Sequence, residues 1–233
     1  MVNLYKEEMA KDGVNIDILS KGQKGQRGTW REAYSWLWDH KFLRWLDQNY
    51  WSILQERAKT VYDWIQFKTE KEVKELVEVT KAPSLRIPPP SVPEIPPTIP
   101  ANQLLWMRID LEYSNYQLLL FNRSQQGKYL LCPSFGYARN SIIDKPPILL
   151  PQKDSLADQT GQKFIFEEMG KEEFLAIAIK EPLNLPWLTP KQEEALPEWN
   201  AERIKELFEQ LAQQDNWQVF YQSFEVVERE TEP

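Results

Sequence analysis

The sequence of 233 residues predicts an α+β protein, in which a tryptophan-rich helical half precedes a β-sheet half with one helix near its end. Two observations predict this class. Apolar residues recur at helical spacing up to about residue 80 and alternate with polar residues beyond residue 104. Eight of the 17 prolines lie between Pro83 and Pro100, where neither a helix nor a central strand can continue. We therefore expect two unlike halves separated by a Pro-rich linker.

The expected division has four parts: a flexible arm over residues 1–28, a Trp-rich helical region over 29–81, a Pro-rich linker over 82–103 and a β-domain over 104–228. The arm ends in the Gly- and Lys-rich stretch SKGQKGQRG and shows no apolar periodicity. The linker should be extended polyproline II, which rises about 3.1 Å per residue and acts as a semi-rigid spacer. Its Pro-x-x-Pro spacing also suits aromatic grooves that read polyproline II, but we favour the spacer.

The helical region should start at Thr29, because Thr29 and Glu32 have the spacing of a capping box. Two apolar stripes follow at helical spacing, and a break near residues 47–49 would separate them into a helical hairpin, although one bent helix also fits. A third, more polar helix over residues 70–80 would make a three-helix unit. The stripes consist of Trp30, Tyr34, Leu37, Trp38, Phe42 and Trp45, and then of Trp51, Leu54, Ala58, Val61, Tyr62 and Ile65.

Beyond the linker the apolar period becomes two, which indicates strands. Residues 116–121 and 128–132 flank a polar turn that ends in Gly127, as expected for a hairpin. Asn200 should cap a helix with apolar residues at i, i+3, i+4 and i+7. The other expected strands cover residues 105–111, 148–150, 163–166, 174–180 and 217–227.

Four landmarks between Tyr116 and Trp187 occur in a defined order, over about a third of the chain. They are Phe121-Asn122-Arg123 before Gly127, then Leu131-Cys132-Pro133-Ser134, then Leu149-Leu150-Pro151, and last Gly170, Glu172 and Phe174-Leu175-Ala176. This pattern resembles a mainly cyanobacterial domain family of unknown function, often attached to caspase-like proteases or serine/threonine kinases. The resemblance implies an immunoglobulin-like β-sandwich that serves as an accessory module, without catalytic residues. The chain carries no protease or kinase domain, and residues 1–81 match no family that we recognise.

Composition excludes several classes of function. The net charge of −7 disfavours a general nucleic-acid binder, and the acidic excess lies in residues 101–233, with 13 basic and 21 acidic side chains. A single Cys and a single His cannot form a disulfide framework or a Cys/His zinc site. The mean hydropathy of −0.59 and the lack of an apolar run near 18 residues predict no membrane span. The charged N-terminus has no apolar signal region, so we expect a cytoplasmic protein.

Candidate catalytic groups are few. Cys132 and His40 could form a thiol–imidazole pair, but the Pro-rich tract lies between them. The adjacent carboxylates Glu167-Glu168, Glu172-Glu173 and Glu193-Glu194 suit a solvated surface better than a glycosidase cleft. Asp154 and Asp158 do not have the spacing of a cation-binding loop, and the glycines near Gly22 lack the lysine of a phosphate-binding loop. We therefore predict no catalytic, cofactor or metal residues.

The concentration of six tryptophans between Trp30 and Trp64 points to an interaction surface instead. We expect the first faces of the helices to pack together, which would leave a second face for a protein partner or for self-association. Packing on the β-domain is the competing interpretation, and Asp39, Asp47 and Asp63 disfavour membrane-surface binding. The expected partner-binding residues are Trp36, Leu43, Tyr50, Ile53, Trp64 and Phe67. The predicted function is a non-enzymatic adaptor or regulatory protein; a structural subunit or homo-oligomer, and a hydrolase with an unrecognised carboxylate site, are the alternatives.

Overall fold

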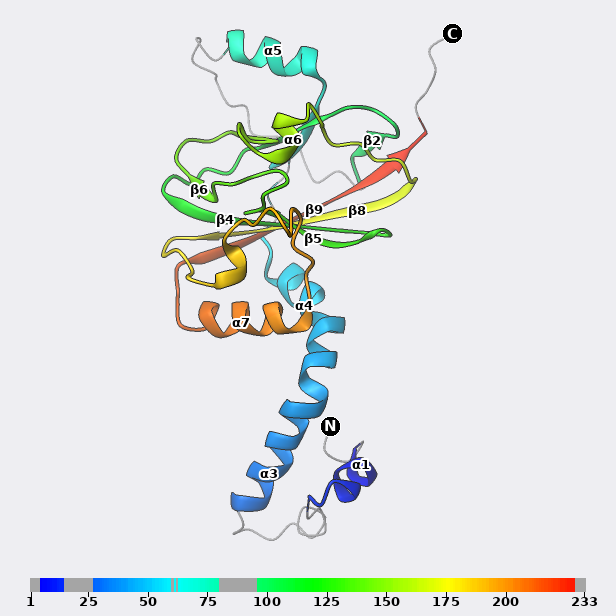
Figure 1. The fold of residues 1–233 in the computed structure, drawn as a ribbon, viewed down its shortest axis with the longest axis vertical. Helices are drawn as coiled ribbons and strands as arrows, with labels where there is room; N and C mark the ends of the chain where they lie inside the picture. The colour runs from blue at the N-terminus through cyan, green and yellow to red at the C-terminus, as the bar shows by residue number, and fades with distance from the viewer. Residues whose placement is uncertain (1–4, 15–26, 60, 62, 80–95, 229–233) are drawn as a thin grey trace. The chain divides into compact units, whose positions relative to one another are not determined.

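The computed structural model contains both helices and sheets, which confirms the α+β class (Figure 1). The chain forms two compact units. One comprises Met1–Trp51 with Asn200–Glu206, and the other comprises Ser52–Trp199 with Leu207–Pro233. Within these, the structure describes residues 5–14, 27–59, 61, 63–79 and 96–228.

The first unit is built on one long helical run. Helix α3 (Arg27–Leu37) continues through a single π-helical turn, η2 (Trp38–Phe42), into α4 (Leu43–Arg57), which carries the chain into the second unit. The expected break at residues 47–49 is absent from this run, so the structure has a single helix in place of the hairpin. These residues include no Pro or Gly, and the Asn49 side chain donates a hydrogen bond to the Trp45 carbonyl oxygen at 2.7 Å, which keeps the polar group within the helix.

A short helix, α1 (Lys6–Lys11), packs on this run and corrects the prediction of a flexible arm over residues 1–28. Met9 is fully buried and forms a small core with Ala33, Trp36 and Leu37. Its i,i+4 spacing from Tyr5, which packs against the same core, is a signal in the sequence that the prediction missed. Residues 15–26, with most of the Gly- and Lys-rich stretch, lie outside the described residues.

The second expected apolar stripe does not continue as a helix beyond Arg57. The Lys59 N–H donates to the Val219 carbonyl oxygen at 2.8 Å, as part of a parallel bridge to Phe220. Asp63 then adopts a left-handed backbone with φ of 56°, a conformation that Asp tolerates better than most residues. The chain therefore enters a sheet at Ile65, where a helix was expected.

The second unit contains two sheets. A three-stranded antiparallel sheet has the order β1-β3-β7, with β1 (Ile65–Lys68), β3 (Trp106–Ile109) and β7 (Ile148–Leu150). A six-stranded sheet has the order β2-β9-β8-β4-β5, with β2 (Thr98–Pro100), β9 (Trp217–Val227), β8 (Gly170–Ile179), β4 (Tyr116–Ser124) and β5 (Gly127–Cys132), and β6 (Ile142–Ile143) also pairs with β4. The remaining elements are α5 (Glu70–Val79), α6 (Leu156–Gln159), the 3₁₀ turn η3 (Pro186–Leu188) and the second part of α7 (Ala201–Leu211), whose first residues belong to the first unit.

The two sheets share one hydrophobic core. Alternate residues of β4, β8 and β9 point to the same face of the larger sheet and join the buried residues of the smaller one. The opposite face carries Phe121, whose ring centroid lies 4.3 Å from that of Trp199. The larger sheet is therefore covered on both faces. Core residues from the two sheets include Ile65, Met107, Ile109, Leu150, Leu118, Leu120, Phe174, Ala176, Phe220 and Phe224.

The Gln222 side chain joins the two sheets directly. Its amide oxygen accepts from the Ile65 N–H at 3.2 Å, and its amide nitrogen donates to the Ile65 carbonyl oxygen at 3.2 Å. Gln222 thus supplies to the outer edge of β1 the two hydrogen bonds that a neighbouring strand would supply. Through these two hydrogen bonds, β1, which precedes the proline tract in the sequence, is attached to the larger sheet.

The structure therefore divides the chain at a different place from the sequence prediction. Strand β1 precedes the proline tract and β2 forms the end of it, yet both belong to the second unit. Residues 96–103 are not a spacer, because β2 pairs in parallel with β9 and Ile99 is buried. The rest of the predicted linker, residues 82–95, lies outside the described residues.

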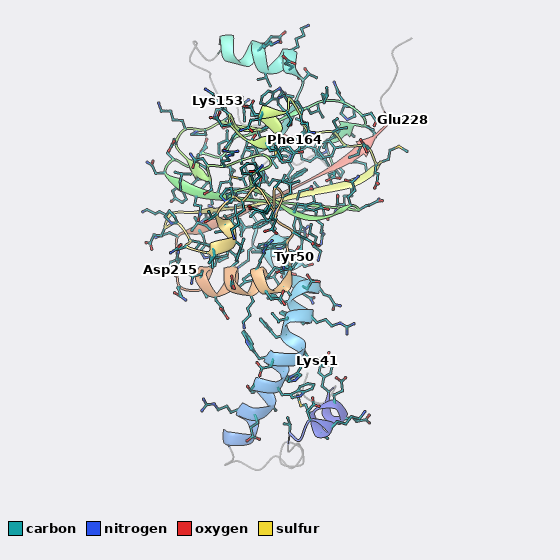
Figure 2. The ribbon with its side chains drawn as sticks, viewed as in Figure 1. Lys41, Tyr50, Lys153, Phe164, Asp215 and Glu228 are labelled. Carbon is teal, nitrogen blue, oxygen red and sulfur yellow. The ribbon has the colours of Figure 1, made fainter. Side chains whose placement is uncertain are left out.

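Most expected strands of the second unit are present. The hairpin of β4 and β5 is confirmed, and Gly127 closes its turn with φ of 146°, a conformation that favours glycine. The expected strand over residues 163–166 is wrong, because this segment forms only an isolated bridge between Phe164 and Leu105. The Phe164 side chain still packs in the core (Figure 2).

Candidate functional site

Four aromatic residues form an exposed stripe along α3, η2 and α4, which we name the aromatic stripe. Tyr34, Trp38 and Trp45 are 61%, 44% and 42% exposed, and Phe42 is half-buried between the two tryptophans. The ring centroids of Trp38 and Phe42 lie 3.8 Å apart, and those of Phe42 and Trp45 lie 6.1 Å apart, both in stacked arrangements. Trp38, Phe42 and Trp45 thus form a contiguous stack of rings, and the exposed Tyr34 lies four residues before Trp38 on the same helical run.

The aromatic stripe includes the π turn η2, which begins at Trp38 and ends at Phe42. Residues four apart lie on the same face of a helix, and this spacing brings the Trp38 and Phe42 rings together. The Lys205 ammonium lies 5.6 Å from the Trp38 ring centroid, within the same unit. π turns in helices often occur at functional positions.

The opposite side of the same helix is covered by α1. Trp36 is 7% exposed, and its indole N–H donates to the Asp12 carboxylate at 2.7 Å. The Lys41 ammonium pairs with Glu8 and lies 5.6 Å from the Trp36 ring centroid, and Figure 2 shows Lys41 on the side of the helix next to α1. The His40 ring stacks on Trp36 at 4.7 Å. Trp36 is therefore an anchor for α1.

The structure buries three of the six predicted partner-binding residues and half-buries the other three. Trp36, Tyr50 and Trp64 are 7%, 1% and 1% exposed, and Leu43, Ile53 and Phe67 are half-buried. The Phe67 ring contacts four phenylalanine rings of the β-sheet core. The prediction that these six side chains form an exposed face is wrong. The face expected to be packed, which includes Tyr34, Trp38 and Trp45, is the exposed one.

A polar cluster lies at one end of the larger sheet, around the buried carboxylate of Glu173. Glu173 is 7% exposed and accepts hydrogen bonds from three side chains: Arg123 on β4 at 2.8 and 2.5 Å, Lys171 on the same strand β8 at 3.0 Å, and Tyr221 on β9 at 2.6 Å. Arg123 lies directly opposite Glu173 in the β4–β8 register. The carboxylate has its acceptor sites filled, which suits a structural ion pair better than a reacting group.

The two adjacent carboxylates of β8 have opposite electrostatic environments. Burial opposes ionisation of Glu173, but the hydrogen bonds from Tyr221, Lys171 and Arg123 together outweigh it and lower its pKa. Burial raises the pKa of Glu172, and the charges of Glu168 and Glu173 add to the rise, while the hydrogen bond from Asn122 opposes it. Since neighbouring residues of a strand point to opposite faces, these carboxylates cannot face each other across one cleft.

The other candidate catalytic groups have structural surroundings. Glu167, Glu168 and Glu193 are exposed. Asp158 accepts a hydrogen bond from the Asp154 N–H at 3.0 Å in the turn that starts α6. In the part of the chain that the structure describes, no group of three or more His, Cys, Asp or Glu side chains could hold a metal ion. Across the same residues, no helix is long and apolar enough to cross a membrane.

Cys132 has the environment of a packed core residue. It is 1% exposed at the end of β5, and its thiol lies 3.6 Å from the Leu118 carbonyl oxygen. Burial raises the pKa of the Cys132 thiol to about 12, so that the thiolate required for nucleophilic attack is not formed near neutral pH. His40, the proposed base, stacks on Trp36 in the first unit.

We expect Cys132 to be inert to thiol reagents while the protein is folded. With Ellman's reagent at pH about 8, less than roughly 5% of the thiol should react within minutes, because the reaction needs an accessible thiolate. In denaturant one equivalent should react at the rate of a free cysteine. Stoichiometric labelling of the folded protein would show that Cys132 is accessible and would restore the thiol–imidazole hypothesis.

Comparisons with known proteins identify no relative from which a role for these residues could be transferred. No protein-family model, curated protein sequence or solved structure matches the chain. The assignment of a site therefore depends on the geometry alone.

Proposed function

We propose that this protein is a non-enzymatic adaptor or regulatory protein that binds a protein partner through the aromatic stripe of Tyr34, Trp38, Phe42 and Trp45. The observation that supports this proposal is the exposure of three large aromatic side chains on one side of a helix whose other side is already packed against α1. A structural role inside the unit would bury these rings, as it buries Trp36.

The composition of the stripe indicates how the partner would bind. Tryptophan and tyrosine are enriched among the residues that contribute most to binding energy in protein interfaces. Their spacing along one helix fits the mode in which a helix inserts its side chains into an apolar groove on another protein. Arg31, Asp39 and Arg44 are exposed on the same helical run, so the surface near the stripe carries both signs of charge.

We expect substitution of the stripe to abolish partner capture without unfolding the protein. The double variant Trp38→Glu/Trp45→Glu should weaken binding of a captured partner by at least roughly 100-fold, since each tryptophan at an interface centre contributes about 2 kcal/mol or more. Affinity capture with the immobilised full chain, followed by titration of each captured protein, measures this. Circular dichroism checks that the variant is folded.

Leu104→Glu/Ile165→Glu is the matched control, because these side chains are 58% and 47% exposed in the second unit. It introduces the same charge away from the stripe and should leave binding unchanged. Partners that bind the wild type and both variants equally would contradict the proposal. Light scattering of the wild type tests the homo-oligomer alternative, since a stripe-dependent dimer would identify the partner as a second copy.

The accessory-module prediction for the β-domain is part of this proposal. The core shared by two sheets is compatible with a sandwich, and we retain the immunoglobulin-like character and the resemblance to the mainly cyanobacterial family as hypotheses. The Glu173 carboxylate, whose acceptor sites are filled by Arg123, Lys171 and Tyr221, is a poor candidate for a reacting group, which argues against the hydrolase alternative at this carboxylate. We also retain the expected cytoplasmic location as a hypothesis.

A further inference from the structure

A cleft of about 480 Å³ opens in the second unit where α4 and α7 end and β9 begins. Its size falls in the range of small-molecule sites, roughly 300–1,000 Å³. The residues that line it include Arg57, Gln214, Asp215 and Trp217, and Figure 2 labels Asp215 just beyond the end of α7. None of these residues contributes to the aromatic stripe.

The cleft presents one cationic and one anionic side chain that do not neutralise each other. The Arg57 guanidinium lies over the Trp217 ring, with its central carbon 4.9 Å from the ring centroid. Among the residues that the structure describes, neither Arg57 nor Asp215 forms an ion pair. A stacked guanidinium keeps its N–H groups available in one plane, the geometry that binds a carboxylate with two parallel hydrogen bonds.

One of the residues that line the cleft, Gln214, has a side-chain hydrogen-bond acceptor that lacks a donor among the described residues. The Gln214 side-chain oxygen is buried without a hydrogen-bond partner in the described part of the chain. The backbone at this residue is fixed, because its carbonyl oxygen accepts from the Trp217 indole N–H at 3.1 Å. A buried amide oxygen is unfavourable until an N–H or O–H group reaches it. The carbonyl end of α7 nearby adds partial negative charge, so a cationic donor is favoured.

We propose that this cleft binds a small zwitterion of the α-amino-acid class. The ligand carboxylate pairs with the guanidinium of Arg57. The ligand ammonium group donates to the carboxylate of Asp215 and to the side-chain oxygen of Gln214, and its three N–H groups are sufficient for both. This site is independent of the aromatic stripe and adds a small-molecule ligand to the proposed adaptor.

The test measures thermal unfolding of the full chain with each of the common L-amino acids at about 10 mM, since a ligand that binds the folded state raises the unfolding midpoint. We expect at least one amino acid to raise it. Its C-terminal amide and its N-acetyl derivative each lack one of the two charges and should bind at least tenfold more weakly by calorimetry. Equal binding of either derivative would overturn the zwitterion assignment.

Substitutions at two exposed residues of the cleft test the proposed contacts, and substitutions at two exposed residues elsewhere serve as controls. Arg57→Gln and Asp215→Asn should each weaken binding at least tenfold while leaving the unfolding midpoint without ligand close to that of the wild type. Arg139→Gln and Asp144→Asn are matched controls, because both residues are exposed and Arg139 also stacks on an aromatic ring, Phe135. The proposal fails if no amino acid shifts the midpoint, or if the shift persists in both Arg57→Gln and Asp215→Asn.

Discussion

Substitution of Trp64 by alanine should destabilise the second unit by about 3–5 kcal/mol, the range found for large-to-small changes of buried aromatic residues. Trp64 is 1% exposed and belongs to the core shared by the two sheets, where its ring centroid lies 6.1 Å from that of Phe220. Alanine removes the indole and leaves a cavity that the surrounding strands cannot fill. Urea unfolding followed by far-ultraviolet circular dichroism measures the change.

The conservative variant Trp64→Phe should lose less stability than Trp64→Ala. Among the described residues, the Trp64 indole N–H has no hydrogen-bond acceptor, so phenylalanine loses volume but no hydrogen bond. It should cost less than about 2 kcal/mol. Trp45→Ala, at a position 42% exposed, should change stability by less than about 0.5 kcal/mol. If Trp64→Ala and Trp45→Ala had equal effects, the core position of Trp64 would be wrong.

Trp64 also shows where inference from the sequence failed. Local patterns predicted the α+β class, the β4–β5 hairpin and the final strand, because the periods of 3.6 and 2 are set by neighbours in the chain. Whether Trp64 lies in a helix or at the start of a strand depends on residues more than 150 positions away, because Gln222 bonds the adjacent Ile65. The spacing of apolar residues along the chain carries no information about a contact with a residue so distant in sequence.

The inverted prediction for the helix faces has a similar cause. The stripe of Tyr34, Trp38 and Trp45 and the face of Trp36 are both apolar, so periodicity alone does not determine which one packs. The outcome depends on α1, whose short apolar pair Tyr5 and Met9 is too small to stand out from the charged arm around it. The π turn at Trp38–Phe42 could not be predicted either, because π turns leave no composition signal that single-sequence patterns detect.

The Glu173→Gln variant should lose about 2 kcal/mol of stability at neutral pH. The carboxylate receives hydrogen bonds from Arg123, Lys171 and Tyr221, and hydrogen bonds to a charged group each contribute about 1.5–3 kcal/mol. Glutamine keeps the shape of the side chain but turns one acceptor into a donor that faces a cation. The exposure of Lys171, whose side chain is 54% accessible, screens part of the interaction and keeps the expected loss at the lower end.

The dependence of the unfolding free energy on pH tests the same prediction, and the direction of the change can be stated in advance. Because the pKa of Glu173 is lower in the folded state, its ionised form stabilises the fold above the unfolded-state pKa, and this contribution is lost as pH falls through the folded-state pKa. The difference in unfolding free energy between the wild type and Glu173→Gln should therefore stay constant from neutral pH down to the ordinary pKa of a glutamate, and shrink toward zero as the pH falls further, through the folded-state pKa. Urea titrations at a series of pH values measure it.

Glu172→Gln is the matched control on the same strand, and its effect should have the opposite sign. The pKa of Glu172 is raised, chiefly by burial, so its ionised form destabilises the fold at neutral pH and its protonation at lower pH is favourable. Glutamine can still accept the hydrogen bond that Asn122 donates at 2.8 Å, so the variant should be as stable as the wild type or slightly more stable. If both variants lost the same stability at neutral pH, a general effect of altering β8 would explain the result. A loss confined to Glu173→Gln would assign to this carboxylate the charge that holds β4, β8 and β9 together at this end of the sheet.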